Sequence, residues 1–412
     1  MKDEHAHVTN RIPWDPKATG VLTGIKVLDL SRFIAGPLCA QHLADLGADV
    51  IKVEGLNGED SRQNDPRVNG ESLYTALFNR NKRALTLNTR TEKGRSILTE
   101  LVEWADVLVE NFRPGTLAKM GLDKSTLAKL NPALIIASIS GYGADSPLHD
   151  KVLFDCIAQA STGLMTLNSQ GDGKPLLTKI ASADVLSGVY TALGVLAALR
   201  HRDLTGEGQT IDLSVYDSLF SATGTPVPAY VSNGTVPPLN GNRDDFNAPA
   251  NVFRTEDGYV YLHAGTQAFW KRFCEDIVGR PCLVDHPDFA TVDARMRNRV
   301  GAERIVEQYT EQHVSADVEK EFAECGIPCA AVLDIPEVAA SAQPWARNML
   351  FHTTDASGEE LVLIGNPVKL SNSPVSMRLA PPRLGEHTDS IMIHVLDKTP
   401  ADVIALHEEG VI

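Results

Sequence analysis

The sequence lacks several features that mark large classes of proteins. Lys and Arg number 38 against 53 Asp and Glu, and the formal net charge of -15 argues against nucleic acid or an anionic membrane as the main partner. None of the 6 cysteines forms a CxxC pair of the metal-binding kind, so we expect no metal site and a reduced, cytoplasmic compartment. The N-terminal segment has no apolar signal core, and we find no run of 18 apolar residues, so we expect no membrane span.

Common nucleotide and hydrolase motifs are also missing. The segment "LDLSRFIAGP" places bulky residues and a proline where a G-x-G-x-x-G loop would admit a pyrophosphate. No glycine-rich loop ends in Gly-Lys-Ser or Gly-Lys-Thr, and no G-x-S-x-G occurs. A nicotinamide enzyme, a P-loop enzyme and a serine hydrolase of the usual kind are therefore disfavoured.

Apolar strands alternate with helices through the first half of the chain. From Gly24 the pattern predicts a strand, a loop with Gly36 and Pro37, a helix that stops at Gly47 and a second strand that ends at Glu54. Further strands are predicted in "RALTLNT", "DVLVENF", "ALIIASISGYG" and "QTIDLSV", with helices between them. Continuous apolar strands of this kind are typical of parallel sheets. We therefore predict an α/β fold with a Rossmann-like, mostly parallel sheet.

Changes in composition suggest how the chain is divided. One stretch rich in proline, glycine and asparagine has no sustained periodicity and is interpreted as a linker. The segment that follows it predicts a hairpin about Asp257 and Gly258 and then helices. The last segment holds too few strands for a core of its own, so we predict that it returns to the first domain. The predicted parts are an N-terminal arm (1–23), the first part of a large domain (24–225), a linker (226–250), a small α+β domain (251–338) and the returning segment (339–412).

Asp184 lies at the start of the helix predicted at 183–201. We interpret Ser182 as the N-cap, so that the free N–H groups and the dipole of the first turn keep the Asp184 carboxylate ionised. Aspartates are common in first turns, so these residues alone also allow a purely structural role. Small residues such as Gly188 and Gly194 would permit close approach of another backbone or of a ligand.

Seven segments, in order from about Gly24 to Thr388, resemble the class III coenzyme A transferase family. The resemblance implies an interlocked homodimer, a large Rossmann-like domain built from both chain ends, and a small central domain. It implies no tightly bound cofactor, because coenzyme A and acyl-CoA are substrates. The segments are "DLSRFIAGPLCAQHLADLGADVIKVE", "NRNKRALTL", "ENFRPGTLAKMGL", "SISGYG", "FDCIAQASTG", "SADVLSGVYTALGVLAALRHRDLTGEGQTIDLSVYD" and "PPRLGEHT".

The same resemblance places Asp184 at the position of the catalytic nucleophile. An ionised carboxylate there would form a mixed anhydride with the acyl group and then an aspartyl thioester with CoA, before an acceptor acid reverses the steps. We favour succinyl-CoA as the donor, whereas the acceptor acid cannot be read from the sequence. Asp155 either assists Asp184 or is a structural acid.

An acidic protein needs local cations to bind the phosphates of CoA. By resemblance, Phe112 would stack on adenine and Asn111 would donate or accept hydrogen bonds. Each basic residue could equally be a solvated surface charge. The residues implied for CoA are Arg32, Ala35, Leu87, Arg90, Asn111, Phe112, Arg113 and Lys119, with Arg83 and Lys151 as further members of the group.

Two alternatives to CoA transfer remain open. The 2-methylacyl-CoA racemases resemble the same framework but carry a histidine where this chain has Phe154, which cannot move a proton. A catalytically silent CoA-binding protein is the other alternative, because a fold constrains the reaction only loosely.

Overall fold

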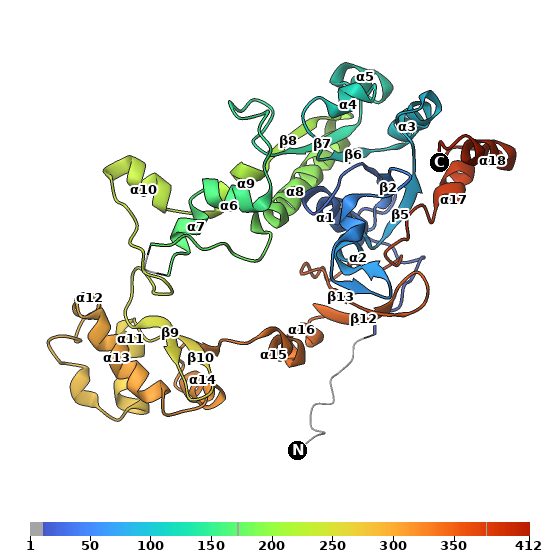
Figure 1. Cartoon of the computed structure of the whole chain (residues 1–412). Helices are drawn as coiled ribbons and strands as arrows, with labels where there is room; N and C mark the ends of the chain where they lie inside the picture. Colours follow the sequence, from blue (N-terminus) through green and yellow to red (C-terminus); the bar gives the residue numbers. More distant parts are fainter. Residues whose placement is uncertain (1–10, 171–172, 376) are drawn as a thin grey trace. The chain divides into compact units, whose positions relative to one another are not determined.

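The structure is a computed structural model that describes residues 11–170, 173–375 and 377–412. Their contacts divide the chain into two units (Figure 1). The first unit combines the chain up to Gly163 with Thr178–Gly224 and Ala342–Ile412. The second unit combines Leu164–Leu177 with Thr225–Ser341.

A six-stranded sheet forms the centre of the first unit. Every pair of neighbouring strands in it is parallel, which confirms the predicted α/β fold with a large, mostly parallel sheet. The strands are rich in Val, Ile and Leu because both faces of a parallel sheet are covered by helices. Their order is β5 (Lys82–Thr86), β2 (Asp49–Glu54), β1 (Lys26–Asp29), β6 (Val107–Glu110), β7 (Ile135–Ser140) and β8 (Thr210–Ser214).

Helices from distant parts of the chain cover the two faces of this sheet (Figure 1). On one face, α1 (Ala35–Asp45) and α8 (Ser182–Thr205) pack over Val27 and its neighbours in the buried core. On the other face, α3 (Glu92–Trp104), α17 (Thr388–His394) and α18 (Pro400–Glu408) pack over Leu28 and its neighbours. Successive residues of β1 thus enter opposite cores, as the pleat of a strand requires.

Helix α8 is the most apolar long helix among the described residues. By length and composition it is long and apolar enough to cross a membrane, and 44% of its most apolar window is buried. It contacts α1, α9 (Val215–Ala222), β7 and β8 in the first unit. Packing against the sheet and its neighbouring helices explains the buried part of this apolar composition.

The second unit has a core of its own around an antiparallel sheet of β11 (Cys329–Ala331), β10 (Tyr259–His263) and β9 (Ala250–Arg254). Strands β9 and β10 form the predicted hairpin, which is thereby confirmed. The segment interpreted as a linker begins with a helix, α10 (Pro226–Asn233). The prolines of this segment are compatible with the helix, because N–H groups in the first turn of a helix form no hydrogen bonds within it.

Shorter elements complete both units. The first unit also contains η1 (Asp60–Gln63), β3 (Arg67–Val68), β4 (Glu71–Ser72), α2 (Leu73–Asn79), α4 (Thr116–Lys119), α5 (Lys124–Leu130), α6 (Asp155–Ser161), α16 (Ala342–Ala346), β12 (Leu350–Thr354) and β13 (Glu360–Ile364). The second unit also contains α7 (Leu164–Leu167), α11 (Gln267–Arg272), η2 (Phe273–Ile277), η3 (Pro281–Leu283), α12 (Val292–Arg297), α13 (Arg299–Thr310), α14 (Ser315–Glu324) and α15 (Ile335–Ala340).

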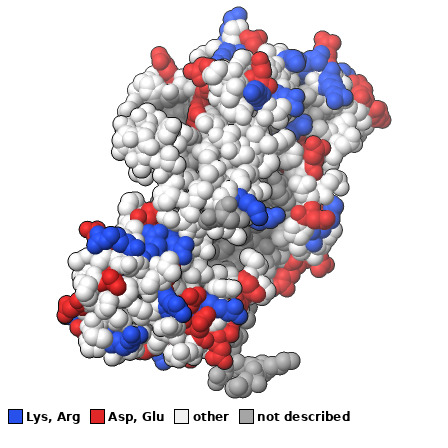
Figure 2. Space-filling model, turned by 60° about the vertical axis from the view of Figure 1, so that its left-hand side comes forward, with Lys and Arg blue, Asp and Glu red and all other residues white. Residues whose placement is uncertain are grey.

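Charged side chains of both signs are interspersed on the molecular surface. Figure 2 shows Lys and Arg lying among Asp and Glu on the viewed face, with broad areas that carry neither. The excess of acidic residues is therefore not gathered into one continuous acidic field on this face.

Candidate active site

The start of α8 is held by a carboxylate from another helix. Asp155, the first residue of α6, accepts a hydrogen bond through Oδ1 from the backbone N–H of Ala183 at 2.7 Å. Its Oδ2 accepts from Nε2 of the buried Gln159 at 2.7 Å. Gln159 also donates to the backbone carbonyl of Ile180. Asp155 therefore supplies the cap of α8 and orients the turn that carries Asp184.

This arrangement corrects the predicted capping of α8. Ser182 lies inside the helix, the N-cap is Ala181, and no side chain at the N-cap forms a capping hydrogen bond. The Oγ of Ser182 is buried and has no hydrogen-bond partner within the described part of the chain. A serine before an aspartate is a reasonable N-cap signal, but here the cap comes from α6, which local sequence could not indicate.

The carboxyl group of Asp184 is partly buried in the first turn of α8. Burial, and then the negative charge of Asp155, raises the pKa of Asp184 from 3.8 to about 7. The first-turn N–H groups and the helix dipole were expected to keep this group ionised, whereas burial acts in the opposite direction. Burial and the charges of Asp184 and Glu59 also raise the pKa of Tyr74, which places Tyr74 within electrostatic range of both carboxylates.

Gly188 brings α8 against the start of α1. A Cβ at Gly188 would lie 2.8 Å from the backbone oxygen of Ala35 and 3.0 Å from side-chain atoms of Leu38. Only glycine leaves room for this approach. Since Asp184 lies one turn before Gly188 on the same helix, its turn is next to the first turn of α1, where the predicted site residue Ala35 is buried.

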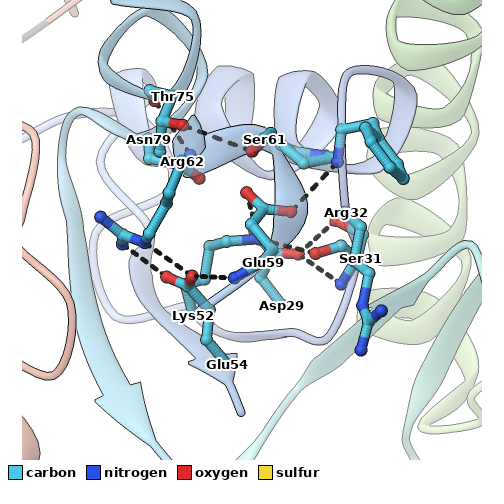
Figure 3. A network of polar contacts seen from close by, with 12 residues as sticks. Asp29, Ser31, Arg32, Lys52, Glu54, Glu59, Ser61, Arg62, Thr75 and Asn79 are labelled. Carbon is cyan, nitrogen blue, oxygen red and sulfur yellow. Dashed lines mark hydrogen bonds and ion pairs between the residues drawn. The ribbon is translucent and has the colours of Figure 1, made fainter. Parts of the chain in front are cut away.

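Buried charged residues are gathered around the carboxyl ends of β1 and β2 (Figure 3). Glu54 binds Arg62 through two hydrogen bonds of 2.6 and 2.7 Å. Asp29 pairs with Lys82 at 2.8 Å. Although burial opposes it, attraction to Lys82 and Lys52 lowers the pKa of Asp29. These charges are compensated in pairs, which is what permits their burial.

A cavity of about 420 Å³ opens at the carboxyl ends of β1, β2 and β5, the edge at which parallel sheets bind ligands. The predicted residues that line it are Arg32, Leu87, Arg90 and Phe112. The Arg32 guanidinium lies 5.8 Å from the centre of the Phe112 ring, which is within the range of a cation–π contact. The cavity thus combines an aromatic face with two arginines, although Glu54 and Glu59 also line it.

A second cavity, of about 330 Å³, lies beside the first, at the end of β6 and along one face of β7 and β8. Phe112 lines both cavities, and Arg113 lines this one. Asn111 lines neither of them. Its side chain instead accepts from the N–H of Arg32 and donates to the carbonyl of Arg32, each at 2.8 Å, so it holds the backbone at the edge of the first cavity.

Besides Ala35 and Asn111, three predicted CoA residues lie outside the lining of these two cavities. Arg83 forms an ion pair with Asp49 at 2.7 Å. Lys119 ends α4, and Lys151 is an exposed loop residue. Their roles in binding CoA stay predictions.

Glu59 and Tyr74 were not predicted as site residues from the sequence. Glu59 follows the carboxyl end of β2, a position that often faces a ligand in parallel sheets, so this signal was available. Tyr74 lies on α2 and carries no local signal, because only packing of α2 in the first unit brings it near Asp184. Among the described residues, no group of three His, Cys, Asp or Glu is placed to hold a metal ion.

Comparisons with known proteins match almost the whole chain. The model of the family described as CoA-transferase family III matches residues 22–388. A formyl-CoA:oxalate CoA-transferase of Rhodopseudomonas palustris (strain BisB18) is 32% identical over 416 residues, which cover 95% of this chain and 97% of that protein. The beta subunit of a succinyl-CoA–L-malate CoA-transferase of Chloroflexus aurantiacus is 35% identical over 397 residues, covering 95% and 98% of the two chains.

Solved structures agree with these matches. The crystal structure of a CAIB/BAIF family protein from Brucella suis is similar to this chain, with a TM-score of 0.83 and 34% identity. The similarity covers 92% of this chain and 100% of that one. The chain therefore belongs to CoA-transferase family III and is a transferase enzyme.

Proposed function

We propose that this enzyme moves CoA from an acyl-CoA, with succinyl-CoA as the favoured donor, to a carboxylic acid, and that Asp184 is its nucleophile. The names of two relatives support the reaction class, since one transfers CoA from formyl-CoA to oxalate and the other from succinyl-CoA to L-malate. Both of those acceptors are dicarboxylic acids. We propose a small dicarboxylic acid as the acceptor here as well.

The observation that carries the proposal is the setting of Asp184. Its carboxyl group is partly buried beside Asp155, and the Gly188 contact keeps its turn against the start of α1. The loop that joins β1 to α1 contains Arg32, which lines the first cavity. If Arg32, Arg90 and Phe112 hold the nucleotide of a CoA ester, its acyl end would therefore reach Asp184.

The proposed reaction needs no group beyond the substrates. The Asp184 carboxylate attacks the carbonyl carbon of the thioester and the C–S bond breaks. CoA is released as a thiolate, and an acyl–aspartyl anhydride is formed. The thiolate then attacks the Asp184 carbonyl carbon, releases the donor acid and forms an aspartyl thioester. The acceptor carboxylate repeats the two steps in reverse, which restores Asp184 without net proton uptake.

The first turn of α1 is a candidate source of oxyanion stabilisation. Its N-cap residue, Ile34, provides no side-chain cap, and its third residue, Pro37, has no N–H. The N–H groups of Ala35 and Gly36 are therefore the candidates to stabilise a developing negative charge. A partly buried site also limits hydrolysis of the anhydride by water.

Trapping the acylated enzyme tests the proposal. Purified protein is mixed with succinyl-CoA and then hydroxylamine, which converts an activated aspartyl group into a hydroxamate, and the peptides are examined by mass spectrometry. We expect the label on Asp184 and transfer of CoA to one of a panel of acids that includes malate and oxalate. Asp203→Asn, at the far end of the same helix, is the matched control and should label normally.

Other outcomes would contradict the proposal. Undiminished transfer by Asp184→Ala would exclude Asp184 as the nucleophile. Exchange of the substrate α-hydrogen with solvent deuterium without any change of CoA partner would indicate a racemase. Binding of CoA without transfer to any acid of the panel would indicate a silent CoA-binding protein.

We further infer that the working form is a homodimer, which the resemblance predicts to be interlocked. The first unit exposes large apolar side chains on neighbouring helices α6, α8 and α9. Leu193 on α8, for example, is 61% exposed. Exposed apolar patches of this kind mark interaction surfaces. We define this apolar face as Phe154, Ile157, Ile180, Val189, Leu193 and Phe220.

A further inference from the structure

The loop that joins β1 to α1 links the cavity to the Asp184 turn. We call residues 30–34 the crossover loop. Arg32 lines the first cavity from this loop. The loop then leads directly into Ala35, whose backbone oxygen limits the approach of Gly188 on α8. Any change in the loop's backbone would therefore move the start of α1 relative to Asp184.

Side chains from several strands hold the backbone of the crossover loop (Figure 3). Asp29 accepts from the N–H of Ser31 at 2.9 Å, and Lys52 donates to the carbonyl of Ser31 at 2.6 Å. Asn111 holds both backbone groups of Arg32. These side chains come from β1, β2 and the residue that follows β6, so the sheet and its edge fix the loop.

Phe33 is the strained position of the crossover loop. Its φ is 63°, in the left-handed region that residues with a side chain rarely adopt. The N–H of Phe33 donates to Oε2 of Glu59 at 3.1 Å. No other hydrogen bond to Glu59 from the crossover loop is present among the described residues.

Glu59 is buried, with 6% of its surface exposed. Its backbone N–H is held by Glu54 at 3.0 Å. Its Oε1 lies 3.6 Å from Nζ of Lys52 and has no hydrogen-bond partner in the described part of the chain. Burying a carboxylate in this way is costly. Within the described ranges, the hydrogen bond that the Glu59 side chain accepts comes from the N–H of Phe33.

We propose that Glu59 is a positioning residue for CoA transfer, which holds Phe33 in its left-handed conformation and thereby fixes the first turn of α1 beside Asp184. This inference rests on the proposed function. Glu59 acts through the backbone of the crossover loop and takes no part in bond making. Its contribution should therefore lie in the rate of transfer once the substrate is bound.

Substitution of Glu59 tests this role. We expect Glu59→Ala to lower kcat for CoA transfer by about 100-fold, the loss typical of a misplacement of roughly 1 Å, with a smaller change in KM. Glu59→Gln should retain most of kcat, because its amide oxygen can still accept from the Phe33 N–H. Equal loss in the two variants would overturn the hydrogen-bond role.

A second substitution separates positioning from simple loss of stability. Glycine adopts a φ of 63° without a steric penalty, whereas alanine does not. Glu59→Ala combined with Phe33→Gly should therefore regain part of kcat, and Glu59→Ala combined with Phe33→Ala should not. Thermal melting of each variant shows whether it is folded. Rescue by both second substitutions, or by neither, would contradict the proposal.

Assays of the wild-type enzyme separate failure of the Glu59 role from failure of the proposed CoA transfer. If it transfers CoA and labels at Asp184, but Glu59→Ala retains full kcat, only the role of Glu59 is wrong. If the wild-type enzyme transfers no CoA, the proposed function itself fails.

Discussion

Asp184 is a carboxyl group whose neighbours oppose its ionisation. Burial and the charge of Asp155 raise its pKa to about 7, so near neutral pH a large fraction of the free enzyme holds this group protonated. The protonated form is a poor nucleophile. The chemistry proposed for this residue is therefore tied to pH more closely than for an ordinary aspartate.

The pH dependence of transfer follows from this pKa. Because the ionised form attacks, kcat/KM should rise about tenfold per pH unit below 7 and level off above about pH 8. The profile of kcat/KM is measured from initial rates at pH 5 to 9 and low acyl-CoA concentration. Asp155→Asn removes the negative neighbour, so its profile should shift to lower pH. A profile that is flat from pH 5 to 9 would contradict the assignment.

Linkage gives the sign of the accompanying effect on stability. The pKa of Asp184 is higher in the folded protein, at about 7, than its ordinary value of 3.8. Between these values the folded state holds a proton that the unfolded chain has lost. The favourable contribution of this group is therefore fully present below about pH 4 and is lost as the pH rises through about 7.

At the scale of the element, the position of α8 depends on a contact that tolerates no side chain. Gly188 meets a backbone oxygen of α1, whereas a Cβ at Gly194 on the same helix would first meet the side chain of Ile211, at 3.2 Å. A side chain can shift, but a backbone oxygen at a helix start cannot do so without moving the helix.

The two glycines of α8 should therefore respond differently to substitution by alanine. Gly188→Ala should lower stability by about 1–3 kcal/mol through overpacking. It should also reduce kcat, because the added Cβ would push α8, and Asp184 with it, away from α1. Gly194→Ala should be nearly neutral, since the better helix propensity of alanine offsets a small shift of Ile211. Urea denaturation and transfer rates of both variants test this expectation. An equal cost for the two would disprove the close-approach argument.

Secondary structure was predictable from the sequence to the extent that it is local. The six strands of the sheet were evident because each is a short apolar run bounded by turn residues. The cap of α8 was not, because Asp155 lies 28 residues before the N–H of Ala183 that it accepts from. Pro226 and Pro228 suggested a linker, yet the early positions of a helix accept proline.

At the scale of the whole molecule, the apolar face predicts a specific change in assembly. Leu193→Glu places a charge on this face and should convert a dimer into a monomer, as measured by size-exclusion chromatography with light scattering. Ile404→Glu on α18, where the side chain is 60% exposed on the other face of the sheet, is the matched control and should leave the dimer intact. A wild-type protein that is monomeric at micromolar concentration would contradict the inference.

The candidate site could be predicted from the sequence only in part. Asp184, Arg32, Leu87, Arg90 and Phe112 were identified through the resemblance, and four of these residues line one cavity. The charges beneath the site were not foreseen, because a lysine within "DVIKVE" or "NKRALTL" looks like any strand lysine. Lys82 finds its partner Asp29 at a separation of 53 residues, and such pairs become visible only when the sheet is assembled.

The burial of Lys52 and Lys82 has a consequence for an enzyme that handles reactive thioesters. Free amines are acylated by such compounds, and burial lowers the pKa of Lys82, which would make it a better nucleophile than an ordinary lysine if it were reachable. Its side chain is 0% exposed and that of Lys52 is 1% exposed. The native fold thus shields both amines from stray modification by its own substrates.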